Sequence, residues 1–354
     1  MAEGAHARMR ILITGTRAPA TLDLARRLHK EGAAIIGADS ARFPLGRFSR
    51  AFKSHHRVAA PRWAPDTFRS QILGLAAQEQ IDLIIPTCEE MFHLAPLHGH
   101  LPEGIELFCP PPSICDLLHH KLKFANYTTK PGAQIQSPAS WNGTEAPEDG
   151  QLIWKPYYSR FGVQTLHKGK PRELTGWMAQ KKMEGKEVSS WAWCRNGRVK
   201  IQTVYEGTVR YKNGAACAFQ PQPAPEIHRF VQEIAKQTTY TGFLAFDFIT
   251  TPEGKTWVLE CNPRLTSGIH ILNPETKLLE DQTKTTPDGP AEIFLATLLA
   301  KPSQAGKLAD VIHRRNDPWP TIGQMVSTIE FAQTAWQHKI SLTAATTWDI
   351  EFNG

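Results

Sequence analysis

The sequence predicts a fold of the α/β and α+β classes, in which a small domain with a parallel sheet precedes a larger part built on antiparallel sheets. Over roughly the first hundred residues, buried strands alternate with helices, as in parallel α/β domains. Three consecutive prolines, Pro110 to Pro112, then mark a boundary, because they stiffen the chain and remove backbone donors. After them, short strands separated by turns replace the alternation, which is typical of antiparallel sheets.

The alternation in the first part is read from short apolar runs and from apolar residues at helical spacing. Each strand is followed by a helix that returns the chain to the same edge of the sheet, which indicates a parallel, doubly wound, Rossmann-like arrangement. Residues 1–9 have no apolar core and are expected to be disordered. The expected strands cover 10–14, 33–38, 82–85 and 105–108, and the expected helices lie at 22–28 and near 65–79.

The turn after the first strand allows two interpretations. Gly15 follows that strand and Asp39 ends the second one, as in a dinucleotide-binding fingerprint. Arg17 and Ala20, however, stand where that fingerprint has further glycines. The pattern therefore favours a tight strand-to-helix turn, with a dinucleotide site as the alternative.

The length and the charge narrow the classes of protein. A chain of 354 residues is long enough for two or three packed units. The net charge of +6 comes from 40 basic and 34 acidic residues spread along the chain, whereas nucleic-acid binders usually concentrate basic residues on one face. We therefore expect no nucleic-acid partner, and the mild excess fits a small anionic ligand.

Apolar runs and cysteines predict a soluble protein with reduced thiols. No run approaches the roughly 18 apolar residues that span a bilayer, so we expect no membrane contact and a cytoplasmic location. The six cysteines are scattered without a C-x-x-C pair, which favours buried thiols over disulfides or zinc.

The hairpin between Gly242 and Arg264 carries the most chemical information. Thr251-Pro-Glu-Gly254 has the signature of a type I turn, and facing Thr251 with Gly254 would place Asp247 opposite Val258. Alternation along both strands then predicts one wholly apolar core face, made of Leu244, Phe246, Phe248, Trp257, Leu259 and Cys261.

The other face of this hairpin collects Asp247, Glu260 and Asn262. Three oxygen ligands without sulfur or imidazole suit a hard cation, and Mg²⁺ fits better than Zn²⁺. The alternative is a half-solvated hairpin whose polar face meets water.

Glu260-Cys-Asn-Pro-Arg264, followed by Thr266-Ser-Gly268, resembles the signature that closes the nucleotide site in the ATP-grasp superfamily. The resemblance is closest to the carbamoyl-phosphate synthetase large subunit and biotin carboxylase branch. It implies that Glu260 and Asn262 bind two Mg²⁺ ions, with Asp247 as the preceding ligand. It also implies that Arg264 contacts the phosphoryl group being transferred.

Other segments resemble further parts of the same nucleotide site. Lys155, in Ile153-Trp-Lys-Pro156, resembles the lysine that holds the nucleotide phosphates, and Lys121 resembles the earlier nucleotide-binding lysine. For each lysine, an ordinary surface residue is the alternative. The loop 157–162 stands where relatives carry a glycine-rich lid but has one glycine, and Ser159 is a substitute donor there. The remaining ATP-binding residues lie around the hinge that would contact adenine and ribose: Gln180, Met183 and Glu187.

The resemblance also implies a domain order. A pre-ATP-grasp domain would cover residues 10–112, and a two-lobed ATP-grasp domain 113–300. Its central lobe would span about 113–185 and its C-terminal lobe would start at about 186. We expect residues 301–354 to form an extension packed on the ATP-grasp domain.

The implied activity is an ADP-forming carboxylate–amine ligase. ATP and two Mg²⁺ ions would serve to make an acyl phosphate, which an amine then attacks. Glu89 or Glu90 would meet the amine, with solvated loop acids as the alternative, and Arg210 would bind a carboxylate. A phosphotransferase and a non-catalytic ATP-binding protein are the other classes considered, and a homodimer is left open.

Overall fold

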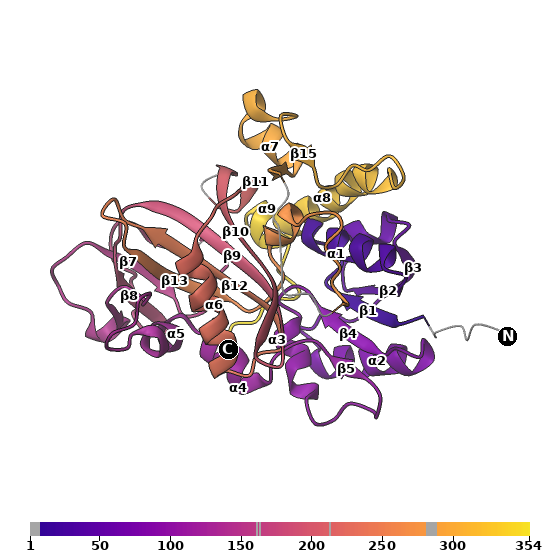
Figure 1. Cartoon of the computed structure of the whole chain (residues 1–354), viewed down its shortest axis with the longest axis horizontal. Helices are drawn as coiled ribbons and strands as arrows, with labels where there is room; N and C mark the ends of the chain where they lie inside the picture. Colours follow the sequence, from indigo (N-terminus) through magenta and orange to yellow (C-terminus); the bar gives the residue numbers. More distant parts are fainter. Residues whose placement is uncertain (1–7, 161, 163, 212–213, 281–288) are drawn as a thin grey trace. The chain divides into compact units, whose positions relative to one another are not determined.

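The computed structural model describes residues 8–160, 162, 164–211, 214–280 and 289–354 (Figure 1). The expectation of disorder at residues 1–9 therefore lies almost wholly outside the described residues. The chain forms two compact units, each made of segments that are distant in the sequence. Within the described residues, unit 1 comprises 8–111, 274–280 and 310–352, and unit 2 comprises 112–273, 289–309 and 353–354.

Unit 1 contains a five-stranded parallel sheet with the strand order β3-β2-β1-β4-β5. The predicted parallel α/β architecture is confirmed. β3 escaped prediction because its sequence is polar and its side chains are half-buried. The strands are β1 (Arg10–Thr14), β2 (Ala34–Asp39), β3 (Phe52–Arg57), β4 (Leu83–Pro86) and β5 (Glu106–Leu107). The helices are α1 (Pro19–Lys30), η1 (Leu45–Phe48), α2 (Pro65–Gln78), α3 (Met91–Leu94), η2 (Ala95–Leu97), α8 (Trp319–His338) and α9 (Leu342–Ala345).

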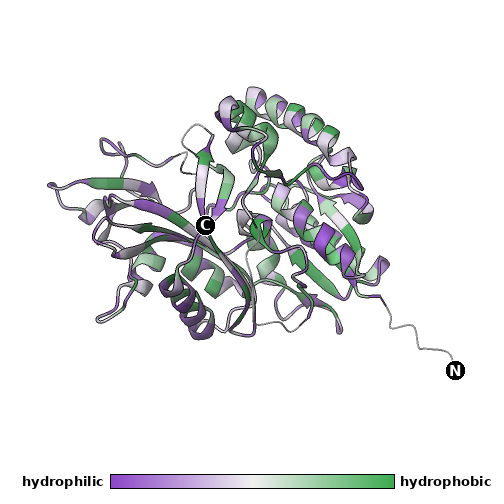
Figure 2. Cartoon of the chain, turned by 45° about the horizontal axis from the view of Figure 1, so that its top comes forward, coloured by the Kyte–Doolittle hydropathy of each residue, from purple (hydrophilic) through white to green (hydrophobic). Residues whose placement is uncertain are grey.

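The core of unit 1 forms around its central strands, which are coloured as hydrophobic in Figure 2. Ile11, Leu12 and Ile13 of β1 are fully buried, as are the helix residues Leu22 and Leu28. The strand order reverses between β1 and β4, and ligands of open α/β sheets bind outside the strand ends at such a point.

The C-terminal segment 310–352 clusters with unit 1, whereas residues 301–309 belong to unit 2. The physical reason lies in the buried charges near α1. Arg17, whose side chain is 3% exposed, pairs with Asp39 at 2.5 Å and with Asp349 at 2.5 Å. Arg26 Nε likewise lies 2.9 Å from Asp317 Oδ2. Because a buried guanidinium is costly without counter-charges, these contacts fix the segment to unit 1.

The same network decides between the two interpretations of Gly15. The carboxylate of Asp39 is fully buried and is engaged by Arg17, so it is not an open acceptor for a ribose. Gly15 has a φ of +68°, and a Cβ there would lie 2.6 Å from Glu90 Oε1. The glycine is therefore required by a tight turn, which is the favoured interpretation.

Unit 2 contains two sheets whose described strand pairs are antiparallel, as predicted. The three-stranded sheet, ordered β6-β8-β7, contains β6 (Ser140–Asn142), β7 (Leu152–Pro156) and β8 (Trp177–Lys181). The seven-stranded sheet, ordered β13-β12-β9-β10-β11-β14-β15, contains β9 (Lys186–Arg195), β10 (Arg198–Arg210), β11 (Ala216–Pro221), β12 (Gly242–Thr250), β13 (Thr256–Asn262), β14 (Ala291–Glu292) and β15 (Ala309–Asp310). The helices are α4 (Pro112–His119), α5 (Lys121–Thr128), η3 (Gly143–Glu145), α6 (Pro225–Gln237), η4 (Ser267–Ile271), α7 (Phe294–Ala300) and η5 (Pro302–Gln304).

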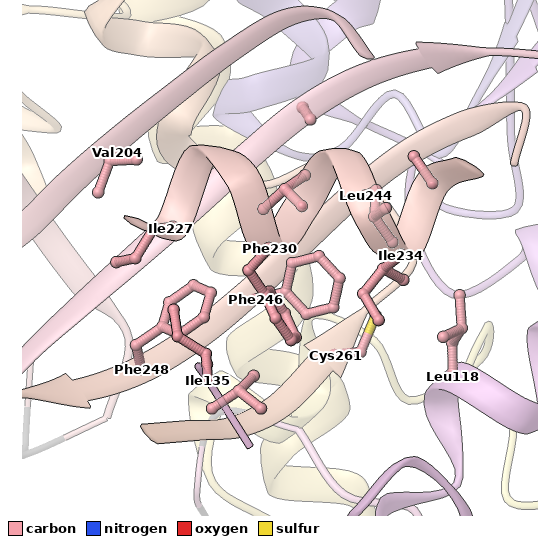
Figure 3. Packing of buried hydrophobic residues seen from close by; sticks show 14 of the residues in the cluster. Leu118, Ile135, Val204, Ile227, Phe230, Ile234, Leu244, Phe246, Phe248 and Cys261 are labelled. Atoms are coloured by element: carbon pink, nitrogen blue, oxygen red, sulfur yellow. The ribbon is translucent and has the colours of Figure 1, made fainter. Parts of the chain in front are cut away.

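One face of the seven-stranded sheet packs against α6 and α5 to form the core of unit 2 (Figure 3). The buried residues of α6 recur at helical spacing, which gives the helix one apolar face. The Phe230 ring lies 5.3 Å from Phe246 and 5.7 Å from Phe248, in the edge-on geometry that aromatic pairs favour. Phe124 of α5 stacks on Phe246 at 5.8 Å. The opposite face of the sheet carries Asp247 beside buried aromatic side chains such as Trp191 and Phe243.

The β12–β13 hairpin has a different register from the predicted one. Gly254 N donates to Thr251 O, so the turn is confirmed. Beyond it Phe248, rather than Asp247, faces Val258. Gly254, with a φ of +83°, takes up the first offset, and an extra residue, Leu259, takes up a second one before Glu260 faces Asp247.

The two offsets change the composition of the core face. Val258 and Cys261 join Leu244, Phe246 and Phe248 in the core. The expectation that Trp257 and Leu259 belong to that face is wrong, because both are half-buried and Trp257 stacks against Lys255. The predicted polar face survives, since Asp247, Glu260 and Asn262 still share one side.

Candidate active site

The centre of the candidate site is a pair of opposed carboxylates. Asp247 on β12 faces Glu260 on β13, and Asn262 lies one pair further along the polar face. Asn262 Nδ2 donates to Asp247 Oδ2 at 3.1 Å. Ser189 Oγ of β9 donates to Asp247 Oδ1 at 2.7 Å. Both oxygens of Asp247 are therefore held in place by neighbouring side chains.

The two carboxylates differ in pKa. Burial and the charge of Glu260 raise the pKa of Asp247 to about 6. Burial also works against ionisation of Glu260, but the charges of Lys121 and Lys155 outweigh it and bring the pKa of Glu260 to about 2. Asp247 is therefore the carboxylate of the pair that is harder to ionise.

Lys121, at the start of α5, is one of the cations that face this pair. Its side chain is 4% exposed, and Nζ lies 3.4 Å from Glu260 Oε2. The same ammonium donates to Ser159 O at 3.0 Å. Lys121 therefore connects the loop after β7 to the carboxylates of the hairpin.

Lys155, on β7, is the second buried cation. Nζ donates to Gln180 Oε1 of β8 at 2.9 Å, and Gln180 Nε2 donates to Ser140 Oγ at 3.1 Å. Burial lowers the pKa of Lys155, while the charge of Glu260 acts in the opposite direction. Gln180 is neutral, so it orients the ammonium without neutralising it, and the positive charge remains available for an anion.

Arg264 follows the end of β13 and is half-buried. Nη2 lies 3.5 Å from Asn262 Oδ1, at the limit of a hydrogen bond. The guanidinium is thus beside the polar face of the hairpin.

Ser189 and Ser140 are site residues that the sequence analysis missed. Ser189 faces Asp247 in the β9–β12 ladder, 58 residues away in the sequence. Ser140 pairs with Gln180 in the β6–β8 ladder. Lone serines without a surrounding motif carry no signal, because only the strand pairing gives them their role.

Glu187 and Arg210 form an exposed ion pair. Arg210 Nη2 lies 2.6 Å from Glu187 Oε2, and their side chains are 35% and 59% exposed. Such exposed pairs contribute about 0–1 kcal/mol, so a ligand separates them at little cost. The residues expected to contact ribose and substrate carboxylate are therefore brought together.

The expected hinge occupies the break between the two sheets of unit 2. β8 ends at Lys181 and β9 begins at Lys186, and the half-buried Met183 lies between them. A Cβ on Gly185 would lie 2.2 Å from Thr250 O, so no side chain fits there.

The loop 157–162 is described except for residue 161. Its first residues are held by the α4–α5 junction, since Lys121 N donates to Tyr157 O at 3.1 Å. The ring of His120 stacks on Tyr157 with 4.3 Å between centroids. Ser159 is buried, and its carbonyl accepts from Lys121.

Glu89 and Glu90 belong to unit 1 and are both buried. Glu90 Oε1 accepts from Thr14 Oγ1 at 2.8 Å and from Thr87 N at 2.9 Å. Burial raises the pKa of Glu90. Glu90 therefore holds the loop after β4 against β1, and neither side chain is the solvated acid of the alternative.

The side chains of the polar face bear on its fit to Mg²⁺. In the described part of the chain, no three His, Cys, Asp or Glu side chains gather into a metal site. The candidate set consists of two carboxylates and the amide of Asn262, an all-oxygen set that suits Mg²⁺. The raised pKa of Asp247 marks the place where a cation relieves carboxylate repulsion. Asn262 now presents its NH₂ to Asp247, so its Oδ1 becomes a ligand only after the amide turns.

No helix in the described part of the chain is both long enough and apolar enough to cross a bilayer. No protein-family model and no curated protein matches the sequence.

Solved structures do match the chain. The biotin carboxylase domain of Hydrogenobacter thermophilus 2-oxoglutarate carboxylase, solved as a dimer with MgADP, ADP and bicarbonate, gives a TM-score of 0.61 at 15% identity; the match covers 80% of this chain and 74% of that one. L-amino acid ligase from Bacillus licheniformis gives 0.59 at 10% identity, covering 79% and 75%. Rhizobium etli pyruvate carboxylase gives 0.58 at 15% identity, covering 74% of this chain but 27% of that one.

These similarities establish the class of fold, which is the ATP-grasp fold. Within that class, the parallel sheet of unit 1 and the antiparallel sheets of unit 2 form the architecture of biotin carboxylase domains and L-amino acid ligase. The resemblance seen in the sequence is confirmed at the level of the fold.

Proposed function

We propose that this chain is an ATP-dependent ligase that phosphorylates a carboxylate and couples the acyl phosphate to an amine, releasing ADP and phosphate. The observation that carries the proposal is the convergence of the buried cations Lys121 and Lys155 on Glu260. The neighbours support it, because one was solved with MgADP and bicarbonate and another is an L-amino acid ligase.

The nucleotide would lie along the cations and the hinge. Lys155 and Lys121 neutralise phosphate oxygens, and Gln180 keeps the Lys155 ammonium oriented. The main chain near Met183 contacts the adenine edge, and Glu187 contacts the ribose hydroxyls once it leaves Arg210. Ser159 lies on the loop that faces the phosphates.

The metal ligands would be Asp247, Glu260 and Asn262, holding two Mg²⁺ ions. Bound Mg²⁺ neutralises charge on the phosphoryl group as it is transferred. Ser189 fixes one oxygen of Asp247 and so limits the positions from which that carboxylate binds a cation.

Arg264 and Lys155 are the proposed catalytic residues. Transfer of the γ-phosphoryl group to a carboxylate brings two anions together, so fixed positive charges lower the barrier. The guanidinium of Arg264 is anchored beside Asn262, and a planar fork of donors suits a phosphoryl group.

The substrates are proposed as a small carboxylate and a small amine. Arg210 offers a carboxylate site because its present partner, Glu187, is held in an exposed pair. Glu89 and Glu90 remain the proposed amine contacts, and because both are buried, contact requires the loop after β4 to rearrange. A cytoplasmic location and the predicted domain boundaries remain predictions.

The test is a product analysis with candidate acids carrying ¹⁸O in the carboxylate. The ligase reaction releases ADP, and one labelled oxygen appears in the free phosphate, because a carboxylate oxygen becomes the bridge of the acyl phosphate. Unlabelled phosphate or release of AMP contradicts the mechanism. Phosphate that stays on the acceptor identifies a phosphotransferase, and nucleotide binding without turnover across pooled acids and amines identifies a non-catalytic protein.

A further inference from the structure

One face of α8 (Figure 1) is buried, as Pro320, Gly323, Ser327 and Phe331 show. A Cβ on Gly323 would lie 2.4 Å from the Phe48 ring, so the helix backbone lies directly against that ring. Ser327 Oγ donates to Phe43 O at 2.5 Å, and Glu330 accepts from Phe43 N at 2.8 Å. These contacts position the helix without help from its other side.

The outward face of α8 carries a continuous apolar stripe. Its residues recur at intervals of three, three, four and seven, which places them within about 120° of the helix circumference, opposite the buried Phe331. The stripe consists of Trp319 (55% exposed), Ile322 (50%), Met325 (52%), Ile329 (60%) and Trp336 (83%).

The stripe is too large to be a scatter of exposed side chains. The five exposures together equal about three whole large side chains, or roughly 600 Å² at about 200 Å² each. That is at the upper end of the largest apolar patch on a typical monomer, about 300–600 Å². It is about three-quarters of the roughly 800 Å² that each partner buries in a standard interface.

The charge pattern of α8 indicates which kind of partner packs on its apolar stripe. Along this helix, which is described throughout, the only Asp, Glu, Lys or Arg is Glu330, and that residue is bonded to the backbone of unit 1. Helices that lie on membranes carry Lys and Arg on the polar face, and α8 has none. An uncharged face can pack against an identical face of a second copy, because no like charges repel each other there.

We propose that α8 is a self-association surface, on which the stripe of one copy packs against the stripe of a second copy in a two-fold dimer. A two-fold interface uses the same patch on both copies, and the stripe has the required symmetry, with a tryptophan near each end and smaller apolar side chains between. In an antiparallel pair, the tryptophans of one helix cover the ends of the other. The inference is independent of the proposed catalytic activity.

The experiment is sedimentation equilibrium of the full chain over about a hundredfold range of concentration. Ile329→Glu places two carboxylates face to face across the two-fold axis, and we expect it to raise the dimer Kd at least about tenfold. Gln324→Glu is the matched control: the same charge on the same helix, about 100° around from Met325, changing Kd less than about twofold. Circular dichroism and the Tm should show that both variants stay folded.

Two results overturn the inference. One is a wild-type chain that stays monomeric over the whole range, and the other is an Ile329→Glu variant that dimerises like the wild type. Anionic phospholipid vesicles serve as the competing probe. Binding of a monomeric wild type to them assigns the stripe to a membrane surface instead and also overturns the inference.

Discussion

Replacing Glu260 by Gln removes one charge from the carboxylate pair and keeps the shape of the side chain. The core face of the hairpin is untouched, because Phe246 and Phe248 point to the other side. We expect ATP turnover to fall by about 10²–10³, the effect of removing one fixed electrostatic stabiliser, about 3–4 kcal/mol. The fold should persist.

Two opposing effects set the expected change in stability. Glu260 is 25% exposed, so loss of its pair with the buried Lys121 costs less than the roughly 3–5 kcal/mol of a fully buried pair. The substitution also stabilises the ionised form of Asp247. The pKa of Asp247, raised from 3.8 to about 6, corresponds to about 3 kcal/mol against that form, and the charge of Glu260 is one of the two main causes. The effects largely offset each other, so the Tm should move by only a few degrees.

The assay is ADP release with Mg²⁺ as the only divalent metal, using an acid and an amine that support turnover. Glu253→Gln is the matched control, since it removes the same charge from the exposed turn of the same hairpin and should leave turnover unchanged. Wild-type activity in the Glu260 variant, together with a normal Tm, would refute the assignment of this carboxylate to metal binding.

Three further predictions concern ligand binding and unit 1. Mg·ATP at about 100 times its Kd should stabilise the wild type by about 2.7 kcal/mol, and Lys155→Ala should weaken that protection in thermal unfolding; stabilisation by NAD and not by ATP would contradict the nucleotide assignment. Asp349→Ala should destabilise the chain by about 2–4 kcal/mol in urea unfolding, because it leaves the buried Arg17 short of a counter-charge, and a loss under about 0.5 kcal/mol would show that the contact is unimportant. Burial raises the pKa of Glu90 above its ordinary value of 4.5, so its contribution to stability is present below about pH 4.5 and is lost as the pH rises through the folded-state pKa. The free energy of unfolding of the wild type, relative to Glu90→Gln, should therefore decrease from pH 4 to pH 7, and an unchanged difference would rule out the burial effect.

The local parts of the site were predictable from the sequence, and the non-local parts were not. Asp247, Glu260 and Asn262 share a face because they lie on one hairpin with a recognisable turn. The register of the β12–β13 hairpin could not be predicted, because the offsets at Gly254 and Leu259 depend on backbone geometry that the side-chain pattern does not encode.

Long-range pairing explains the other differences. Ser189 acquires its role only when β9 lies beside β12. The sequence of α8 (Trp319–His338) does not say which unit this helix covers. That choice follows from buried charges such as Arg17, whose partner Asp349 lies 332 residues away.

The salt bridge between Arg17 and Asp349 has a consequence for biosynthesis. The two residues are 332 positions apart, so a ribosome adding about 5–20 residues per second makes the second one about 17–66 s after the first. During that interval, the N-terminal sheet emerges with a guanidinium that has only Asp39 as a partner. The main segment of unit 2, which ends at Asn273, is synthesised within the same interval. Newly made chains therefore pass through a stage in which all five strands of the unit 1 sheet have been synthesised while Arg17 still lacks the counter-charge of Asp349.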